Sequence, residues 1–434
     1  MAFTWTEQNA LNLSEDEQTR RDGAKLATRA KWPTLGVDER AIWGECQGSG
    51  KTPYRVSVDQ RELAYRCSCP SKKFPCKHTM GLLLLFAKDP SQFEHVAAPE
   101  WVTTWQESRQ ARAAKGPSPV VNQEAQAKRV QARVAKIDEG LQELRLWLCD
   151  LVRHGFTDSQ VKSYAYWDRM AARMVDAQAS AIARRLRQIA TIPIKGDAEW
   201  AARLLDEVSR LYLLAESYQR IDALPVELQE DLRTAIGWAR KKEELLALPS
   251  VRDQWSVVGQ CVEGDDSLRA RRVWLYGEHT RQAALILDFA PGRTPFEETY
   301  ITGQQYDAEL VYYPSAFPQR ALVKQVMGMS TRTLDDPTFL AHETFSAMLG
   351  QYASALGCNP WLERIPFILR RAVLSPHSNG VLLYDAELRT LPLKPSANGD
   401  SRLWVNIAQS GGHPTTVVGE WDGYEVNLLE VMAV

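Results

Sequence analysis

The chain has 434 residues, a formal net charge of −2, and 44% hydrophobic and 24% charged residues. This length favours two or three domains, and the composition is that of an ordinary globular protein. Because the net charge is near neutral, a surface that is basic throughout is excluded. Any contact with nucleic acid must therefore come from a local cluster.

Signals for export and membrane insertion are not expected. The first 21 residues carry acids and no apolar run, unlike a signal peptide. The longest apolar run, residues 82–87, is far too short to span a bilayer. We therefore expect a cytoplasmic protein without a membrane contact. In that compartment, a total of seven cysteines with three in close succession favours metal binding over disulfides.

Residues 1–30 are predicted to be helical and polar, and a strand-rich segment follows. Apolar and polar residues alternate on both sides of residues 60–62, which predicts a hairpin that turns there. Residues 79–88 are apolar almost all round, which predicts a buried helix. Asp89-Pro90 should end this helix, because proline disfavours the helical conformation of the residue before it.

A linker is expected over residues 113–122. The helix that follows keeps apolar residues at 4-3 spacing and ends at His154-Gly155, a cation followed by a glycine cap. Similar helical patterns cover residues 159–190, 198–219 and 225–247. Consecutive helices with short connections predict a bundle. A coiled-coil dimer through the first helix is the alternative, because its apolar pattern would look the same.

Beyond Pro249 the pattern becomes β-rich. Strands are predicted over residues 257–262, 272–276 and 283–289. One helix is predicted from Pro337 to Leu356, with Gly357 as its cap. Asn379-Gly380 and Asp422-Gly423 are typical of two-residue hairpin turns. Whether these strands close a barrel or form a sandwich stays open.

The motif that carries chemistry has the pattern C-x-C, six residues, C-x-H, formed by Cys67, Cys69, Cys76 and His78. Cysteines at i and i+2 of an extended strand point to the same face, so their thiolates can converge on one ion. Three sulfurs and one nitrogen complete a tetrahedral shell, which predicts one structural Zn2+ with no open position for water. Free thiols that pack as small hydrophobic groups are the weaker alternative, because four such residues seldom cluster by coincidence.

The predicted fold class is α+β, with a hairpin-plus-helix zinc finger, a central helical bundle and a C-terminal antiparallel β-rich domain. Removal of the zinc is expected to destabilise the finger and to leave the β-rich domain folded. The expected divisions are an N-terminal helical segment over 1–30, the finger over 31–95, a short helix and linker over 96–122, the bundle over 123–249, and the β-rich domain with one inserted helix over 250–434.

The C-x-C…C-x-H pattern after a hairpin and before an apolar helix resembles the SWIM-type zinc finger. Residues 43–50, Cys69-Pro70-Ser71 and Phe74-Pro75-Cys76-Lys77-His78 look like those of stand-alone bacterial SWIM proteins. This similarity is strong over residues 31–95 and suggestive over the rest. It implies a finger that binds DNA or protein, and no enzyme. It also implies a protein encoded beside a MoxR-type AAA+ ATPase and a protein with a von Willebrand A domain.

Two other motifs are incomplete. The segment Gly48-Ser49-Gly50-Lys51-Thr52 looks like the end of a phosphate-binding loop, but Glu45 stands where that pattern needs glycine. His342-Glu343 opens like a metalloprotease helix, but Ser346 replaces the second histidine. No catalytic set presents itself elsewhere, so we do not expect an enzyme.

The remaining cysteines are interpreted as packed thiols. Cys46 precedes the hairpin and could approach the zinc, but the four ligands already complete the shell, which favours a packed thiol. Cys149, Cys261 and Cys358 lie in helical or strand surroundings and are predicted to be core residues.

Local charge is concentrated in residues 51–79, which hold seven basic and two acidic residues. Phosphate contacts need such charges, and Tyr54, Tyr65 and Phe74 could stack on exposed bases. A solvated face, with the aromatic rings packed under the hairpin, is the alternative. The helix after His78 is too apolar to read a duplex in a groove. The candidate nucleic-acid contacts are Lys51, Arg55, Arg66, Lys72, Lys73 and Lys77.

The sequence thus leads to two functional hypotheses. In the first, a non-enzymatic zinc-binding protein acts as a subunit or adaptor of a larger assembly, with the AAA+ ATPase as the implied partner. In the second, the basic finger grips nucleic acid through its backbone. The near-neutral charge and the size of the region outside the finger favour the first.

Overall fold

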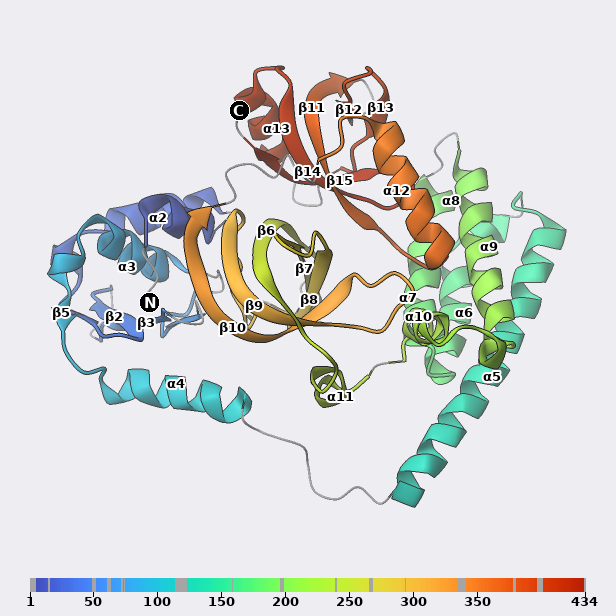
Figure 1. The fold of residues 1–434 in the computed structure, drawn as a ribbon, viewed down its shortest axis with the longest axis horizontal. Helices are drawn as coiled ribbons and strands as arrows, with labels where there is room; N and C mark the ends of the chain where they lie inside the picture. The colour runs from blue at the N-terminus through green and yellow to red at the C-terminus, as the bar shows by residue number, and fades with distance from the viewer. Residues whose placement is uncertain are drawn as a thin grey trace.

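The N-terminal part of the chain is a sheet covered by helices (Figure 1). It contains α1 (Glu7–Asn12), α2 (Glu17–Leu26), β1 (Thr34–Val37), β2 (Ala41–Cys46), β3 (Tyr54–Asp59), β4 (Ala64–Cys67), α3 (Lys77–Lys88) and β5 (Glu94–His95). The strand order is β4-β3-β2-β1-β5. The computed structural model describes residues 5–14, 16–48, 52–60, 64–71, 73, 75–113, 123–157, 159–195, 199–238, 240–264, 268–292, 294–333, 341–377, 380–395 and 401–432.

The predicted hairpin and buried helix are both present in this part. β3 and β4 pair antiparallel, with Val58 opposite Tyr65. The α3 side chains from His78 to Leu85 are buried, and the helix lies against α2 and the sheet. A further helix, α4 (Glu100–Ala113), returns along the sheet, where Val102 packs on Trp43.

The helical bundle occupies the middle of the chain. It contains α5 (Gln123–His154), α6 (Tyr164–Asp176), α7 (Ser180–Ile189), α8 (Thr191–Lys195), α9 (Trp200–Tyr218) and α10 (Val226–Ile236). The apolar stripe of α5, from Ile137 to Leu151, faces the bundle core together with Trp167. This burial favours the bundle over the coiled-coil dimer. The predicted linker lies outside the described residues, except for Ala113 at the end of α4.

Two helices predicted as continuous are broken. The pattern over residues 159–190 forms α6 and α7, because the chain turns between them at Gln178, whose φ is +60°. The pattern over residues 225–247 is interrupted at Gly237, whose φ of +104° suits glycine and caps α10. The short helix α11 (Lys242–Leu246) follows it.

A closed barrel follows the bundle. It contains β6 (Val251–Gly264), β7 (Leu268–Gly277), β8 (Ala283–Pro291), β9 (Gln304–Tyr312) and β10 (Arg320–Thr333), in the order β10-β8-β7-β6-β9. β6 pairs with both β7 and β9, and is antiparallel to each. β8 and β10 are parallel, and they pair at Leu285 with Arg320 and at Ile286 with Ala321.

An open sheet in the order β13-β12-β11-β14-β15 forms the C-terminal part. It contains β11 (Ile365–His377), β12 (Gly380–Tyr384), β13 (Thr390–Pro392), β14 (Thr415–Trp421) and β15 (Val426–Met432), with the helices α12 (Phe345–Cys358) and α13 (Ser401–Ser410). The β-rich region therefore holds both a barrel and an open sheet, and the predicted α+β class is confirmed. No helix in the described ranges combines the length and apolar character needed to cross a membrane.

The predicted C-terminal helix differs from the structure at both ends. Pro337 lies outside the described residues, but residues 341–344 are not helical. α12 begins at Phe345, because the hydroxyl of Thr344 accepts the N–H of Ala347 and caps the helix there. His342 lies outside the helix and pairs with Leu369 in a β-bridge. The helix also continues through Gly357 to Cys358, so this glycine is not its cap.

The two predicted hairpin turns differ in outcome. At Asn379-Gly380, β11 and β12 do form a hairpin, in which His377 pairs with Gly380. Residues 378–379 lie outside the described part. At Asp422-Gly423 the two-residue turn is wrong, because Trp421 pairs with Val426 and residues 422–425 form the loop. The carboxylate of Asp422 accepts N–H groups of this loop at 2.9 Å and stabilises its longer form.

One hydrophobic core spans the N-terminal part and the barrel. It includes Trp32, Ile42 and Leu82 from the N-terminal part, and Trp255 and Leu275 from the barrel. In Figure 1 the blue N-terminal part lies beside β10 of the barrel. These two parts lie far apart in sequence, yet they share buried apolar surface and therefore stabilise each other. We call this set the shared core.

A buried ionic network joins the barrel to the C-terminal sheet. The Glu420 side chain is 1% exposed, and its carboxylate accepts hydrogen bonds from Arg272 at 2.7 and 2.9 Å. It also accepts one from the Trp274 indole at 2.7 Å. Burial alone would raise the pKa of Glu420, but the guanidinium groups of Arg272 and Arg364 outweigh it and lower that pKa.

The first testable prediction concerns this network. Glu420→Ala leaves the buried guanidinium of Arg272 with Glu263 as its remaining acidic partner, so the free energy of unfolding should fall by about 3 kcal/mol. Glu387→Ala removes an exposed pair with Arg389 and should cost less than about 1 kcal/mol. Denaturant unfolding followed by tryptophan fluorescence measures both. Equal effects for the two variants would argue against a structural role for the network.

Candidate metal centre

The candidate zinc ligands come from the end of one strand and the start of one helix. Cys67 is the last residue of β4, and Cys69 follows it after one serine. That serine is fixed to β3, because its N–H donates to the Arg55 carbonyl and its hydroxyl accepts the Arg55 N–H, both at 2.9 Å. Cys76 is the N-cap residue of α3, and His78 lies in its first turn.

The fold brings these four side chains together. Their candidate ligand atoms all lie within 4.8 Å of one another, and His78 Nδ1 is 3.9 Å from the Sγ atoms of Cys67 and Cys76. With Zn–S of about 2.3 Å and Zn–N of about 2.0 Å, neighbouring ligand atoms of a tetrahedral site are about 3.5–3.8 Å apart. Small side-chain adjustments therefore suffice to enclose one zinc ion. Within the described residues this is the only cluster found that could hold a metal.

The side chains of the cluster strongly affect one another's pKa. Hydrogen bonding to Cys67 and Cys69 lowers the pKa of Cys76, and hydrogen bonding to Cys69 and Cys76 raises the pKa of Cys67. Burial would lower the pKa of His78, but hydrogen bonds to Cys69 and Cys76 outweigh it and raise that pKa to about 9. Zinc binds the deprotonated forms of cysteine and histidine, so binding of the ion would displace the protons held by Cys67 and His78.

Neighbouring side chains fix the orientation of the ligands. The hydroxyl of Thr79 lies 3.5 Å from the Sγ of Cys76. The Tyr54 ring packs against the imidazole of His78, with 4.8 Å between the ring centroids. Such contacts around the ligands hold them in place for the metal.

Helix α2 forms one wall of the site. Lys73 of the ligand loop pairs with Asp16, the N-cap residue of α2, at 2.7 Å. The two helices approach so closely that a Cβ on Gly81 would lie 2.7 Å from the Cβ of Leu26. A Cβ on Gly23 would meet α3 at 2.5 Å. Sequence reasoning missed this contact, and the glycine within each helix was the available signal.

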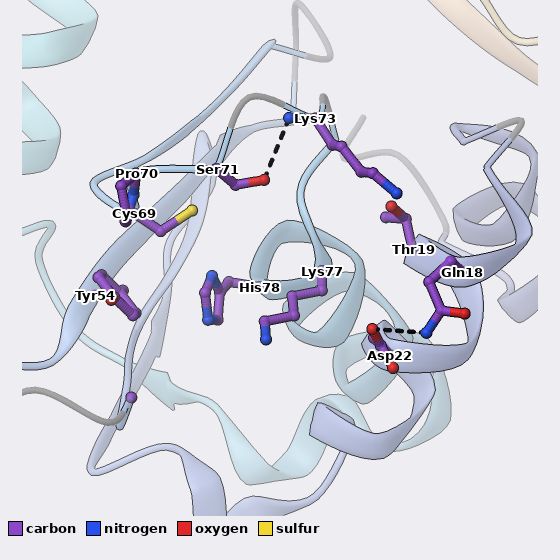
Figure 2. Close-up of a pocket in the computed structure, with 11 residues that line it drawn as sticks. Gln18, Thr19, Asp22, Tyr54, Cys69, Pro70, Ser71, Lys73, Lys77 and His78 are labelled. Carbon is purple, nitrogen blue, oxygen red and sulfur yellow. Dashed lines mark hydrogen bonds between the residues drawn. The ribbon is translucent and has the colours of Figure 1, made fainter.

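A polar cavity of about 530 Å³ lies between α2 and the ligand loop. Figure 2 shows Lys77 and His78 on α3 beside this cavity, with Asp22 of α2 facing Lys77 and Tyr54 lying on the far side of His78. Cys69 also lines it, so the cavity reaches two of the candidate ligands. Its walls carry groups of both charges, and the cavity alone selects no class of ligand.

The predicted nucleic-acid contacts do not all remain free. Arg55 and Lys73 each form an ion pair with an acid, at 3.2 and 2.7 Å. Arg66 and Lys77 are exposed. The positive charge of the finger is therefore partly neutralised within the molecule. Two of the predicted contacts, Lys51 and Lys72, lie outside the described residues.

The aromatic rings considered for base stacking have other roles. Tyr65 is half-buried and packs against the shared core, and burial raises its pKa to about 12. Tyr54 packs on the ligand His78. Phe74 lies outside the described residues. For Tyr65 the structure therefore fits the alternative in which the ring packs under the hairpin.

The remaining cysteines are not part of the four-residue cluster. Cys46 belongs to the shared core, and burial raises its pKa to about 11, which fits a packed thiol. Cys149 and Cys261 are half-buried. Cys358 is exposed at the last residue of α12, so the predicted core position is wrong for this cysteine, because α12 continues to it at the surface.

Two segments match family models. Residues 54–86 match the SWIM zinc finger, and residues 132–236 match the SWIM-associated four-helix bundle domain. This chain carries a SWIM zinc finger and its associated bundle. Together with the cluster of Cys67, Cys69, Cys76 and His78, the match fits a single structural zinc. No curated protein and no solved structure is significantly similar to the chain.

Metal analysis tests the ligand assignment. We predict one zinc per chain, measured by plasma mass spectrometry on the protein after gel filtration. Cys67→Ser and His78→Ala should each lose most of the metal, because three remaining donors no longer close the shell. Cys46→Ser removes a buried thiol outside the cluster and should keep the full equivalent. Retention of one full equivalent in both ligand variants would overturn the assignment.

The contact between α2 and α3 generates a further prediction. Gly81→Val forces the helices apart, so it should lower the free energy of unfolding by about 2 kcal/mol and weaken zinc retention. Gly350→Val in α12 is the matched control, since a Cβ there meets no atom within 4 Å. Thermal unfolding with a zinc assay checks both. Because valine has a higher helix propensity than glycine, propensity alone predicts no loss in either variant. Similar losses in the two variants would therefore contradict a specific role for the close contact.

Proposed function

We propose that this chain is a non-enzymatic, zinc-binding interaction protein of the cytoplasm, acting as a subunit or adaptor of a larger assembly. The observation that carries this proposal is the closed shell of three sulfurs and one nitrogen inside a finger that shares its core with the barrel. A closed shell leaves no position for substrate or water, so the ion serves the fold. Its thiols must stay reduced to bind the metal, which fits a reducing compartment.

The proposed partner is a MoxR-type AAA+ ATPase, with a protein that carries a von Willebrand A domain as a second candidate. This part of the proposal rests on the resemblance of residues 31–95 to stand-alone bacterial SWIM proteins. The bundle and the β-rich region supply most of the surface available to such a partner.

Binding of nucleic acid by the basic finger is the second candidate function. The exposed cations Arg66 and Lys77 support it. The ion pair of Arg55 with Glu45 weakens it, because that charge is already neutralised. Nucleic-acid contacts at the finger therefore depend on a small number of free cations.

The outer face of the barrel does not support nucleic-acid binding either. Small Greek-key barrels of the OB type bind oligonucleotides through the outer face of their second and third strands. In this barrel β7 and β8 take those places, and their side chains Trp274 and Leu285 pack with Val418 and Leu429 of the C-terminal sheet. The C-terminal sheet covers that face of the barrel, so the face is not open to an oligonucleotide. This favours a protein partner over nucleic acid.

Co-purification from native extract at moderate salt, with and without nuclease, tests the proposal. We expect an AAA+ ATPase, identified by mass spectrometry, to remain bound after nuclease treatment. The triple variant Arg66→Glu, Lys73→Glu and Lys77→Glu should retain this partner, because protein contacts lie largely outside the finger. The zinc content of the variant must be checked first, since Lys77 adjoins a ligand.

Two outcomes would contradict this proposal. Recovery of nucleic acid alone, lost at high salt and in the triple variant, would make the basic finger the binding surface. If the unmodified protein retains the partner and the triple variant loses it, the protein contact lies on the finger instead of the bundle and the β-rich region.

A further inference from the structure

The bundle differs from the other parts of the chain in how it is attached. The finger and the barrel share one hydrophobic core, and the barrel packs on the C-terminal sheet through further buried apolar side chains. Within the described residues, no helix from α5 to α10 packs extensively against a helix or strand of these three parts. In Figure 1 the green bundle lies on the side of the barrel that faces away from the blue finger. The finger, the barrel and the sheet thus form one body, and the bundle is attached to its side.

The bundle core receives an apolar side chain from the C-terminal part. Trp361, which follows α12, packs against this core, whereas the other described side chains of the core belong to residues 137–238. The next residue, Leu362, is buried in the core of the C-terminal sheet. The side chain of Asn359 accepts the backbone N–H of Trp361 at 3.0 Å and fixes this turn. Two neighbouring side chains therefore enter two different cores, and Trp361 links the bundle to the sheet.

Polar contacts surround Trp361. On α9, the guanidinium of Arg210 donates to the carbonyl oxygens of Pro360 and Leu362 at 3.4 and 3.5 Å. On α7, Arg184 pairs with Glu363 at 3.2 Å, and both side chains are about half exposed. Exposed ion pairs of this kind contribute little to stability, because water and salt screen them. The apolar contact of Trp361 is therefore the stronger part of this attachment.

The loop between β14 and β15 adds a second polar contact to α9. The Tyr424 hydroxyl donates to the carboxylate of Asp206, and the guanidinium of Arg203 lies 4.8 Å from the centre of the Tyr424 ring. Arg203, Asp206 and Arg210 follow one another at helical spacing, so they lie on one face of α9. We call Trp361 and Tyr424, together with these three residues of α9, the bundle latch.

The connection that follows the bundle lies between α10 and α11. Trp238, just after α10, packs on the bundle core, whereas α11 lies against β9 and β10 of the barrel. In α10 itself, the carboxylate of Asp231 accepts the N–H of Ala316 at 2.8 Å. These contacts can persist while those of α9 separate, because they involve a different helix. The connection between α10 and α11 is therefore the natural pivot for the bundle.

We propose that the bundle is a hinged domain that opens and closes on the C-terminal sheet about the connection between α10 and α11, with the bundle latch holding the closed form. An interface made of one apolar contact and polar surroundings favours relative motion, whereas a large hydrophobic interface would prevent it. Opening withdraws Trp361 from the bundle core and exposes the face of α9 that carries Asp206 and Arg210. A partner that binds this face would hold the bundle open, so the latch is a point of control for whichever partner the chain binds.

Single-molecule fluorescence transfer on the full-length, zinc-loaded chain measures this motion. Dyes are attached through non-natural amino acids at Gln142 of α5 and Ala353 of α12, two exposed positions on the bundle and on the C-terminal part. We expect a main closed population and a minor open population with a distinct transfer efficiency. Raising the salt concentration should increase the open share, because salt screens the charged contacts around Trp361.

Trp361→Ala should raise the ratio of open to closed molecules by about 10-fold, since it removes the apolar contact with the bundle core. Trp404→Ala is the matched control, because this exposed tryptophan lies on α13 of the C-terminal part. It should leave the ratio unchanged. The same ratio in the two variants, with both folded, would overturn the proposal.

Tyr424→Phe keeps the test decisive if Trp361→Ala unfolds the bundle. It removes the hydrogen bond to Asp206 and keeps the aromatic ring, so it should raise the same ratio by about 3-fold. Tyr164→Phe, at an exposed tyrosine of α6, is the matched control and should have no effect. If neither higher salt nor Tyr424→Phe changes the ratio, the bundle is fixed to the sheet and the proposal fails. The proposed function can fail independently, because no partner takes part in these measurements.

Discussion

Closure of one small ligand shell is the constraint on which the N-terminal part of this molecule depends. A loop connects the end of β4 to the start of α3, and the four ligands lie at the two ends of this loop and within it. When zinc binds, the four ligand side chains are rigidly connected through the ion, and this connection orients the apolar helix α3 on its sheet. The zinc consequently has a structural role in the finger.

The rest of the chain is held together by contacts between distant segments. The shared core joins the finger to the barrel, and the buried carboxylate of Glu420 joins the barrel to the C-terminal sheet. The bundle is tied in as well, because Arg184 of α7 pairs with Glu363 at 3.2 Å and the N–H of Ala316 donates to Asp231 of α10. The finger, the bundle, the barrel and the C-terminal sheet are therefore joined by direct contacts into one connected body.

Local patterns in the sequence predict local structure well. The C-x-C…C-x-H spacing, the apolar helix after it and the stripe of α5 all depend on neighbours within a few residues, and the structure bears out these features. The helix predicted from Pro337 begins instead at Phe345, because the Thr344 side chain caps it there. The sequence alone does not show which of several possible residues caps a helix. The barrel and the shared core were out of reach, since they depend on pairings between distant segments. For the contact between α2 and α3, Gly23 and Gly81 were visible in the sequence, but nothing local indicates that the two helices meet at these glycines.

The central claim is that Cys67, Cys69, Cys76 and His78 together close the coordination shell of one structural zinc. X-ray absorption at the zinc edge of the full-length protein tests it most directly. The account predicts three sulfur neighbours at about 2.3 Å and one nitrogen at about 2.0 Å, with no oxygen from water. A shell with fewer sulfurs and a water oxygen would contradict it, because the zinc would then have an open position and the argument for a purely structural ion would be lost.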